Sequence, residues 1–459
     1  MGATAEVGDL STLGNRPLAG KRNRSEAGSV MAFRDRLESR PRYKWYVLGV
    51  LTAVYASSQL DRQIMGILLE PIKLELGASD TQMGFLIGLT FAVFYATLGM
   101  PIAMLADRAN RRNIITAAIS IWSVMTVACG FATTFFQLAL ARIGVGIGEA
   151  GSSPPSHSII ADMFDSASRG TAMGVFALGV NIGLLLAYLV GGWLVEFYGW
   201  RTTFVAVGVP GIVVALLLYF TTKEPTRGAS DKQPAEEKQA APPFSAVVRH
   251  MWTTRSTRHV VLGSTLAGFV GYGFVLWMPT FLIRSHGLSP SEVGLTLALM
   301  TGIVGGLGTF AAGRLTDVLA RRDVRWRAWV VAVGKGGYVP FLAAVFIVDD
   351  FWLALGLFII PAFFGGFYLA PTFALIQSLV SLRMRALASS ITLFILNIIG
   401  MGFGPQLVGI LSDLFAPAYG NESLRMALLL LTFLNLWCAA HYYLAGRALP
   451  ADLERINSR

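Results

Sequence analysis

The chain has 459 residues, of which 54% are hydrophobic and only 14% are charged, and its mean hydropathy is +0.58. A soluble domain carries roughly 25% charged residues, so this composition excludes an ordinary soluble enzyme, a disordered chain and a nucleic-acid-binding domain. It indicates a protein that crosses a membrane many times. The net charge of +10 then has to be explained by its distribution between the two sides of the membrane.

Apolar segments of the length that a bilayer requires, about 20 residues per helix, occur twelve times. They lack period-two alternation, which favours helices over a β-barrel. In chain order the predicted spans are 43–68, 81–106, 113–131, 135–160, 168–193, 202–222, 259–283, 292–316, 327–347, 351–378, 386–412 and 424–446. We therefore predict an all-α membrane protein with twelve transmembrane helices.

Polar segments divide these spans into two sets of six. The longest internal polar stretch runs from Thr221 to about Arg258 and contains several prolines. The expected organisation is a polar tail (residues 1–42), a six-helix bundle (43–222), a linker (223–258), a second six-helix bundle (259–446) and a short tail (447–459). The end of the linker, 244–258, fits either a basic amphipathic helix on the membrane surface or a solvated connection.

The basic residues are distributed unevenly between the loops. Residues 1–44 carry nine Lys or Arg and lack the apolar core of a cleaved signal peptide. An even number of spans places both termini on the same side. With the termini in the cytoplasm, thirty basic residues lie inside, four outside and three within spans. The positive-inside rule therefore predicts cytoplasmic termini, and we expect a multi-pass protein of the inner cell membrane.

One motif occurs twice, 210 residues apart. AMLADRANRR at 103–112 follows the second span, and GRLTDVLARR at 313–322 follows the eighth. The equal topology of the copies predicts two parallel six-helix repeats, an architecture of the major facilitator superfamily. The first copy resembles the signature between helices two and three of that superfamily, with Ala103 and Asn110 in place of its glycines. The resemblance covers about residues 43–446.

This motif also has a physical interpretation. A carboxylate at the end of a helix can cap the N-terminus of a helix in the opposite bundle, which contributes about 0.3–1 kcal/mol. Loss of that cap would accompany opening to the cytoplasm. The alternative is that the arginines only set the topology. The candidate gating residues are Asp107, Arg108, Arg111, Arg112, Asp317 and Arg321.

Ionisable side chains within membrane spans are costly and mark candidate functional sites. At about 1.5 Å per residue, Asp61 and Arg62 lie at the level of Arg142, and Glu149 lies deeper. Arg142 and Glu149 are seven residues apart and share one helix face. These four charges form either a structural ion-pair network or a proton-titrating and anion-binding site. We favour the second interpretation, because burial disfavours an ionised carboxylate whereas a nearby arginine favours it.

Lys335 in the ninth span is expected to extend to the cytoplasmic surface, because it lies only about 12 Å from the end of its span by the same rise per residue.

A closer family resemblance comes from the same residues. Asp61-Arg62 late in span one, Arg142 with GEAGSSP at 148–154, and Asp107-Arg108 together resemble the Spinster (Spns) family, here as a bacterial homologue. The resemblance implies that the four buried charges form the proton-coupling and substrate site, and that the solutes are similar to lysophospholipids and sphingosine-1-phosphate. The GEAG stretch also resembles organic anion symporters.

The second half has many aromatic residues and few buried charges. A charged first half and an aromatic second half suit an amphipathic solute, although each aromatic side chain by itself is more typical of packing. The substrate-binding candidates are Arg62, Arg142, Tyr272, Trp277, Phe364 and Tyr368.

The predicted function is therefore proton-coupled transport of an amphipathic, lipid-like solute by alternating access, with Asp61 and Glu149 carrying the proton. The alternative is a proton symporter for a small organic anion. The chain has no P-loop, no metal-binding spacing and no Ser/His/Asp set, which argues against an enzyme and predicts no cofactor. A receptor that transports nothing is the remaining option. The expected partners are the solute, protons and membrane lipids, without nucleic acid, and the expected state is a monomer.

Overall fold

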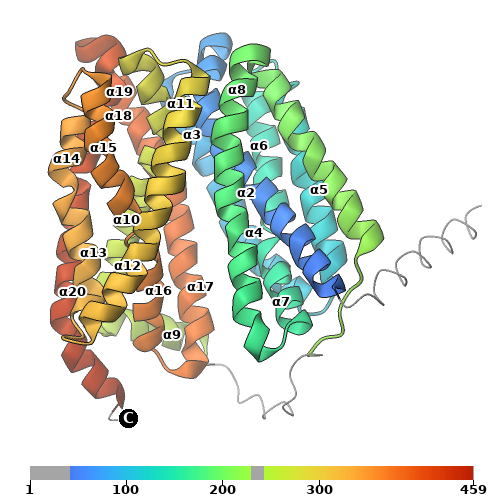
Figure 1. Ribbon diagram of the computed structural model, residues 1–459, viewed down its shortest axis with the longest axis vertical. Coiled ribbons are helices and arrows are strands. Elements are labelled where there is room, and N and C mark those ends of the chain that lie inside the picture. The colour runs from blue at the N-terminus through green and yellow to red at the C-terminus, as the bar shows by residue number, and fades with distance from the viewer. Residues whose placement is uncertain (1–41, 229–241, 458–459) are drawn as a thin grey trace, which may run out of the picture.

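A computed structural model describes residues 42–228 and 242–457. In these ranges the chain is helical and contains no strand. Two helical bundles stand side by side, the first drawn from blue to green and the second from yellow to red (Figure 1). Most of the predicted tail, residues 1–41, and residues 229–241 of the predicted linker lie outside the described residues.

The first bundle contains spans one to six. Its helices are α2 (Tyr43–Leu76), α3 (Asp80–Ile87), α4 (Leu89–Ala106), α5 (Arg111–Cys129), α6 (Phe135–Glu149), α7 (Ser153–Met163) and α8 (Ser166–Thr221). The long helix α8 holds two spans, because Gly199 with φ of 75° interrupts its helical backbone. A positive φ is readily adopted only by glycine.

The second bundle contains spans seven to twelve and has more interruptions. Its helices are α9 (Phe244–Thr253), α10 (Arg255–His286), α11 (Pro290–Leu297), η1 (Ala298–Val304), α12 (Gly305–Ala320), α13 (Trp326–Gly337), α14 (Val339–Val345), α15 (Phe351–Gly365), α16 (Leu369–Ser378), η2 (Leu382–Met384), α17 (Arg385–Ile395), η3 (Leu396–Phe403), α18 (Gly404–Tyr419), η4 (Gly420–Glu422), α19 (Ser423–Thr432) and α20 (Leu434–Asn457). The segments η1 and η3 are π-helical, a feature often found at functional sites.

Eight helical segments of the described chain are long and apolar enough to cross a membrane. Two of them, Ala167–Thr221 and Leu382–Ile456, are 55 and 75 residues long, and each holds two spans. Helix α2 and the broken pair α6–α7 add two more spans, both with buried charges. The described ranges therefore contain the twelve predicted spans.

The end of the predicted linker contains the helix α9. Residues Phe244–Thr253 are helical, and Val247 and Met251 pack into the core of the second bundle. Phe244 and Trp252 lie on the exposed side of the same helix. The remaining residues of the stretch, from Arg255, begin α10.

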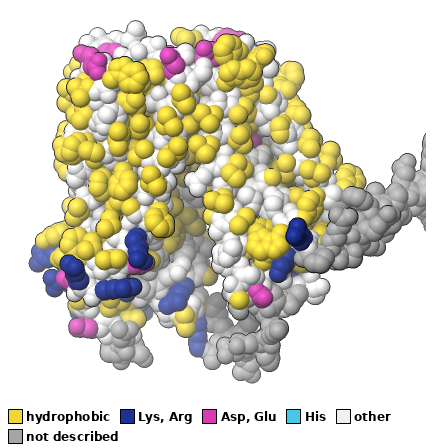
Figure 2. Space-filling view, in the orientation of Figure 1, with side chains coloured by type: hydrophobic (Ala, Val, Ile, Leu, Met, Phe, Trp, Pro, Cys, Tyr) yellow, Lys and Arg dark blue, Asp and Glu magenta, His cyan; other side chains and the backbone are white. Residues whose placement is uncertain are grey.

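Opposite charges gather at opposite ends of the molecule, with an apolar belt between them (Figure 2). We call the end that carries Arg108, Arg249 and Arg321 the basic face. The end that carries Glu196 and Glu292 is the acidic face. Exposed hydrophobic side chains such as Phe310 and Trp352 cover the belt, as expected of a surface in contact with lipid acyl chains.

The two bundles contact each other from the middle of the molecule to the acidic face, through α3 with α18, α8 with α11 and α2 with α10. Toward the basic face the surface between them is hollowed (Figure 2). Close packing at the acidic face requires glycine at Gly294, where a Cβ atom would lie 2.1 Å from the Tyr188 carbonyl oxygen. The structure is therefore closed at the acidic face and open toward the basic face.

We predict that Gly294→Val separates the bundles at the acidic face, because the new side chain collides with the α8 backbone. Overpacking of this kind costs about 1–3 kcal/mol. Spin labels at Leu74 and Leu414, exposed residues of opposite bundles, should report a longer distance. Gly356→Val is the control, because a Cβ there meets nothing within 4 Å. Unchanged distances in the Gly294 variant would contradict the prediction.

Candidate functional site

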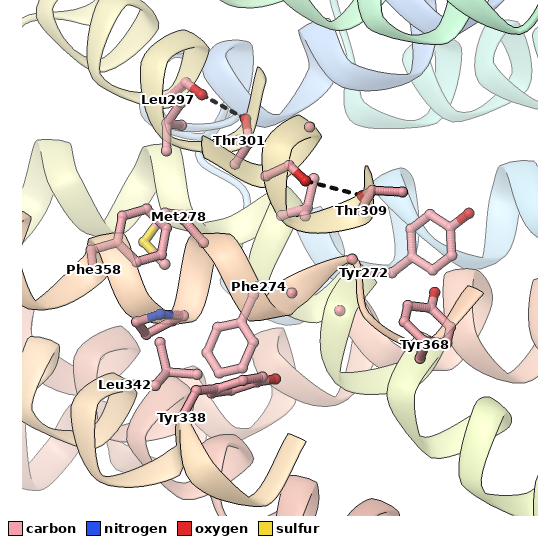
Figure 3. Close-up of a pocket in the computed structure, with 18 of the residues that line it drawn as sticks. Tyr272, Phe274, Met278, Leu297, Thr301, Thr309, Tyr338, Leu342, Phe358 and Tyr368 are labelled. Atoms are coloured by element: carbon pink, nitrogen blue, oxygen red, sulfur yellow. Dashed lines mark hydrogen bonds between the residues drawn. The ribbon is translucent and has the colours of Figure 1, made fainter. Parts of the chain in front are cut away.

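A cavity of about 320 Å³ lies between the two bundles. The first bundle contributes Gln63, Asn181 and Tyr188, and the second bundle contributes all the other lining residues. In Figure 3, Tyr272 and Tyr368 lie at one end of the cavity, and Met278 and Phe358 lie at the other. The lining residues include no Asp or Glu. The cavity therefore combines a polar aromatic end with an apolar end.

Irregular helices expose backbone and leave space at this cavity. Helix α15 ends at Gly365, and η1 replaces regular α-helix between α11 and α12. Thr301 donates a hydrogen bond to the Leu297 carbonyl oxygen and Thr309 donates one to Gly305 (Figure 3). Broken helices of this kind at membrane depth border the binding sites of many transporters.

An ion pair between α2 and α6 lies beside the cavity. The Nε of Arg62 lies 2.6 Å from Oε2 of Glu149, and the Glu149 side chain is completely buried. Ser58 donates a 2.7 Å hydrogen bond to the same oxygen. The guanidinium of Arg62 also stacks over the rings of Phe91 and Tyr95, at 4.9 and 4.3 Å. The Oε2 atom of Glu149 therefore accepts hydrogen bonds from two donors. Its Oε1 atom has no hydrogen-bond partner in the described structure.

Asp61 and Arg142 complete the cluster. Asp61 is completely buried and accepts a 2.8 Å hydrogen bond from Thr126. It lies within electrostatic reach of Glu149, Arg142 and Arg62. Arg142 is 2% exposed, and its Nε and Nη1 atoms lack hydrogen-bond partners among the described residues. The predicted clustering of the four charges is thus present in the fold.

A second cavity, of about 40 Å³, lies next to the central cavity. Arg62 and Arg142 line it, and Gln63 and Tyr272 line both cavities. A solute in the central cavity would therefore lie next to the arginines. Sequence reasoning missed Ser58, Thr126 and Tyr95, because hydroxyl-bearing side chains are common in spans and give no distinctive pattern.

The aromatic substrate candidates divide into two groups. Tyr272 and Tyr368 line the central cavity. Trp277 does not line it; this ring is completely buried, and its Nε1 donates a 2.9 Å hydrogen bond to the Pro405 carbonyl oxygen. Phe364 also lies outside the lining and packs against Phe367 at 4.7 Å between ring centroids. Trp277 is therefore a core residue, and Phe364 is a partly buried residue that packs against the core.

Lys335 contradicts the expectation that it reaches the membrane surface. Its side chain is buried, lines the central cavity and donates a 3.0 Å hydrogen bond to the Gly365 carbonyl oxygen. Lys335 lies nine positions after the start of the span at Trp326 and ten positions before its end at Val345. The depth of Lys335 along its span did not predict its position, because the residue lies on the helix face that points between the bundles.

The candidate gating residues lie at the basic face but do not join the bundles. Asp107, Arg108, Asp317 and Arg321 are exposed. Arg111 instead binds Asp162 and Glu224, and Arg112 donates to the Thr222 carbonyl oxygen, all within the first half and the start of the linker. Neither Asp107 nor Asp317 caps a helix of the opposite bundle in the described residues, as expected when that face is open.

At the acidic face, a carboxylate does cap a helix of the opposite bundle. The oxygens of Asp413 in α18 accept hydrogen bonds from the backbone amides of Asp80 and Thr81, at 3.1 and 2.7 Å, where α3 begins. This contact could not be predicted from the sequence, because its partners lie more than 300 positions apart.

Arg284 in α10 joins the bundles beside this cap. Its guanidinium binds Asp80 at 2.7 and 2.8 Å and Glu70 at 2.6 and 2.8 Å. Lys73 and Ser412 also donate to Asp80. We call the cap and these pairs the acidic clamp; its members are Glu70, Lys73, Asp80, Arg284, Ser412 and Asp413. The clamp holds the acidic face closed.

Twelve spans in two bundles around a central cavity define a multi-pass membrane transporter. Residues 51–405 match the Major Facilitator Superfamily. An MFS-type efflux pump of Mycolicibacterium smegmatis is 35% identical over 414 residues, which cover 90% of this chain and 95% of the pump. Human protein spinster homolog 1 is 27% identical over 89% of this chain and 82% of its own length.

A solved structure supports the same assignment. The crystal structure of a bacterial homologue of the human lysosomal transporter Spinster, in an inward-facing and unoccupied conformation, aligns with a TM-score of 0.81. It is 33% identical and covers 90% of this chain and 99% of the homologue. The chain belongs to the major facilitator superfamily, in its Spinster branch.

We predict that Arg284→Gln opens the acidic face. The substitution leaves the Asp80 and Glu70 carboxylates without their arginine, and breaking a buried ion pair costs about 3–5 kcal/mol. The distance between the labels at Leu74 and Leu414 should lengthen. Arg201→Gln is the matched control, because Arg201 pairs with Glu75 at the surface within the first bundle, a contact worth about 0–1 kcal/mol. Equal distances in the two variants would contradict the role of the clamp.

Proposed function

We propose that this protein moves an amphipathic, anionic solute similar to a lysophospholipid or sphingolipid, coupled to protons, by alternating access. The observation that carries the proposal is the buried Arg62–Glu149 ion pair beside a cavity with a largely apolar wall. The charged cluster supplies proton binding and head-group recognition, and the cavity wall accepts the hydrocarbon part.

Proton binding at Glu149 provides the coupling step. While Glu149 is ionised, its charge neutralises Arg62 at 2.6 Å. Protonation removes that charge, so that the guanidinium gains by binding an anion of the solute. Asp61 is the second proton carrier, and Arg142, with two unpartnered nitrogen atoms, is the second contact for the polar head.

The cavity wall supports an amphipathic solute. Phe274, Met278, Leu342 and Phe358 form an apolar lining, whereas Arg62 and Arg142 lie at the adjoining smaller cavity. Burial of hydrocarbon against such a wall contributes about 25 cal/mol per Å². The resemblance of the sequence motifs to the Spinster family implies the same solute class.

A proton symporter for a small organic anion is the second candidate. A relative in Bacillus subtilis, 26% identical over 61% of this chain and 66% of its own length, is named a probable galactarate/D-glucarate transporter. The same arginines would bind a carboxylate, but the apolar lining would then have no role in recognition.

For alternating access, we propose that the basic face is cytoplasmic, as the positive-inside rule indicates, and that both termini lie there. The acidic clamp and the motif at Asp107 and Asp317 would close opposite faces in turn. A monomer in the inner cell membrane, in contact with its lipids, is sufficient for this cycle, because each chain contains both halves of the site.

We predict that Glu149→Gln and Asp61→Asn abolish or flatten the pH dependence of transport in reconstituted vesicles, because an amide cannot bind and release the proton. The measurement is the initial flux of a radiolabelled lysophospholipid, with and without an imposed pH gradient.

Glu292→Gln is the matched control, because Glu292 is an exposed acid of the acidic face that accepts from Ser289 in the capping box of its own helix. Glutamine also fills that capping position, so the flux should be unchanged. If the flux of the Glu149 and Asp61 variants responds to pH as that of the unaltered protein does, the proton assignment fails.

Competition for flux tests the solute class. We predict that lysophospholipids and sphingoid phosphates inhibit the labelled flux, and that a soluble dicarboxylate such as glucarate does not, because it leaves the apolar wall unfilled. The opposite ranking would favour the organic anion symporter.

A further inference from the structure

We propose that Lys335 forms a second anion-binding point, in the second bundle, which takes a phosphate or carboxylate group of the solute. This inference rests on the proposed function, since it assigns the anionic group of the same solute. It differs from the family site at Asp61, Arg62, Arg142 and Glu149, which lies entirely in the first bundle.

Among the described residues, no Asp or Glu lines the cavity at Lys335. Its Nζ lies 3.0 Å from the Gly365 carbonyl oxygen and 3.5 Å from the Tyr338 hydroxyl. The same atom lies over the rings of Tyr338 and Tyr368, at 5.3 and 4.9 Å from their centroids. Among the described residues it makes no ion pair. A carbonyl and two aromatic faces stabilise a cation only partly.

The charges at the two cavities do not balance. Asp61 and Glu149 offset Arg62 and Arg142 in the first bundle, so the charge of Lys335 remains uncompensated. Because the side chain is 2% exposed, water replaces the missing counter-charge poorly. An anion bound in the cavity would supply it. The uncompensated positive charge of Lys335 therefore favours an anionic solute over a neutral or cationic one.

The shape of the cavity places the rest of the solute. Lys335, Tyr338 and Tyr368 line the same 320 Å³ cavity as Phe274 and Met278. An oxyanion at Lys335 therefore leaves an attached chain in contact with apolar side chains. The Tyr338 hydroxyl already donates to Asn435 at 2.8 Å, which fixes the ring beneath the ammonium group and keeps Lys335 directed into the cavity.

Binding of octyl phosphate to the full chain in lipid nanodiscs tests the proposal. Calorimetric titrations at pH 7 compare the unaltered protein with Lys335→Met, Lys335→Gln and Lys335→Arg, after subtraction of empty-nanodisc heats. Loss of one partner of a buried charge pair costs 2 kcal/mol or more, so the two neutral variants should bind octyl phosphate about thirtyfold more weakly. Lys335→Arg should retain most of the affinity, because it keeps the charge.

Octyl glucoside is the neutral probe with the same chain, and its affinity should not change in any variant. Octanoate replaces octyl phosphate in a parallel titration, and the oxyanion with the larger Lys335-dependent loss is the one that the site takes. Equal affinity of octyl phosphate for the unaltered protein and both neutral variants would overturn the proposal. So would an equal loss of octyl glucoside binding, because it would indicate general damage to the cavity.

The same titration on Glu149→Gln separates this inference from the proposed function. If the flux of that variant keeps its pH dependence while octyl phosphate binding still requires Lys335, the coupling assignment fails and the anion-binding point stands. If the flux loses its pH dependence and Lys335 has no effect on binding, the coupling assignment stands and this inference fails.

Discussion

Neutralisation of charge inside the membrane is the constraint on which the first half of the site depends. An isolated ion in a low-dielectric interior costs several kcal/mol even after relaxation. The pairing of Arg62 with Glu149 at 2.6 Å removes most of that cost and ties α2 to α6. Because Ser58 and the rings of Phe91 and Tyr95 also contact the pair, the geometry is set from three sides, and a change in the charge of Glu149 changes the interactions of Arg62 at once.

The same constraint separates the two bundles. The first bundle carries acids and bases in equal number at membrane depth, whereas the second carries Lys335 without an acid. A transporter needs a site that is stable when empty and is still attractive to its solute. A balanced cluster meets the first requirement, and under the anion-binding proposal the uncompensated cation Lys335 beside an apolar wall would meet the second.

The twelve spans and the four-charge cluster could be predicted because both follow from periodicity and from the position of each residue along its own helix. Hydrophobic length gives the spans, and the seven-residue separation of Arg142 and Glu149 gives their shared face. What each face of a helix contacts in the folded protein could not be predicted in the same way. Lys335 and Trp277 illustrate the limit: depth along a span does not tell whether a side chain points into the cavity, into the core or toward lipid.

Contacts between the bundles were the hardest to predict, because they join residues hundreds of positions apart. Asp413 performs at the acidic face the capping that was expected of Asp107 at the basic face. Opening the acidic face would expose two backbone amides of α3 and separate Arg284 from its carboxylates, and these losses need compensation elsewhere. Asp107 and Asp317 are exposed in this state, and a helix N-terminus of the opposite bundle would restore a comparable cap. In the proposed cycle the two faces would exchange similar interactions. This exchange would keep the open and closed states close in free energy, so that the binding of a proton and a solute would decide between them.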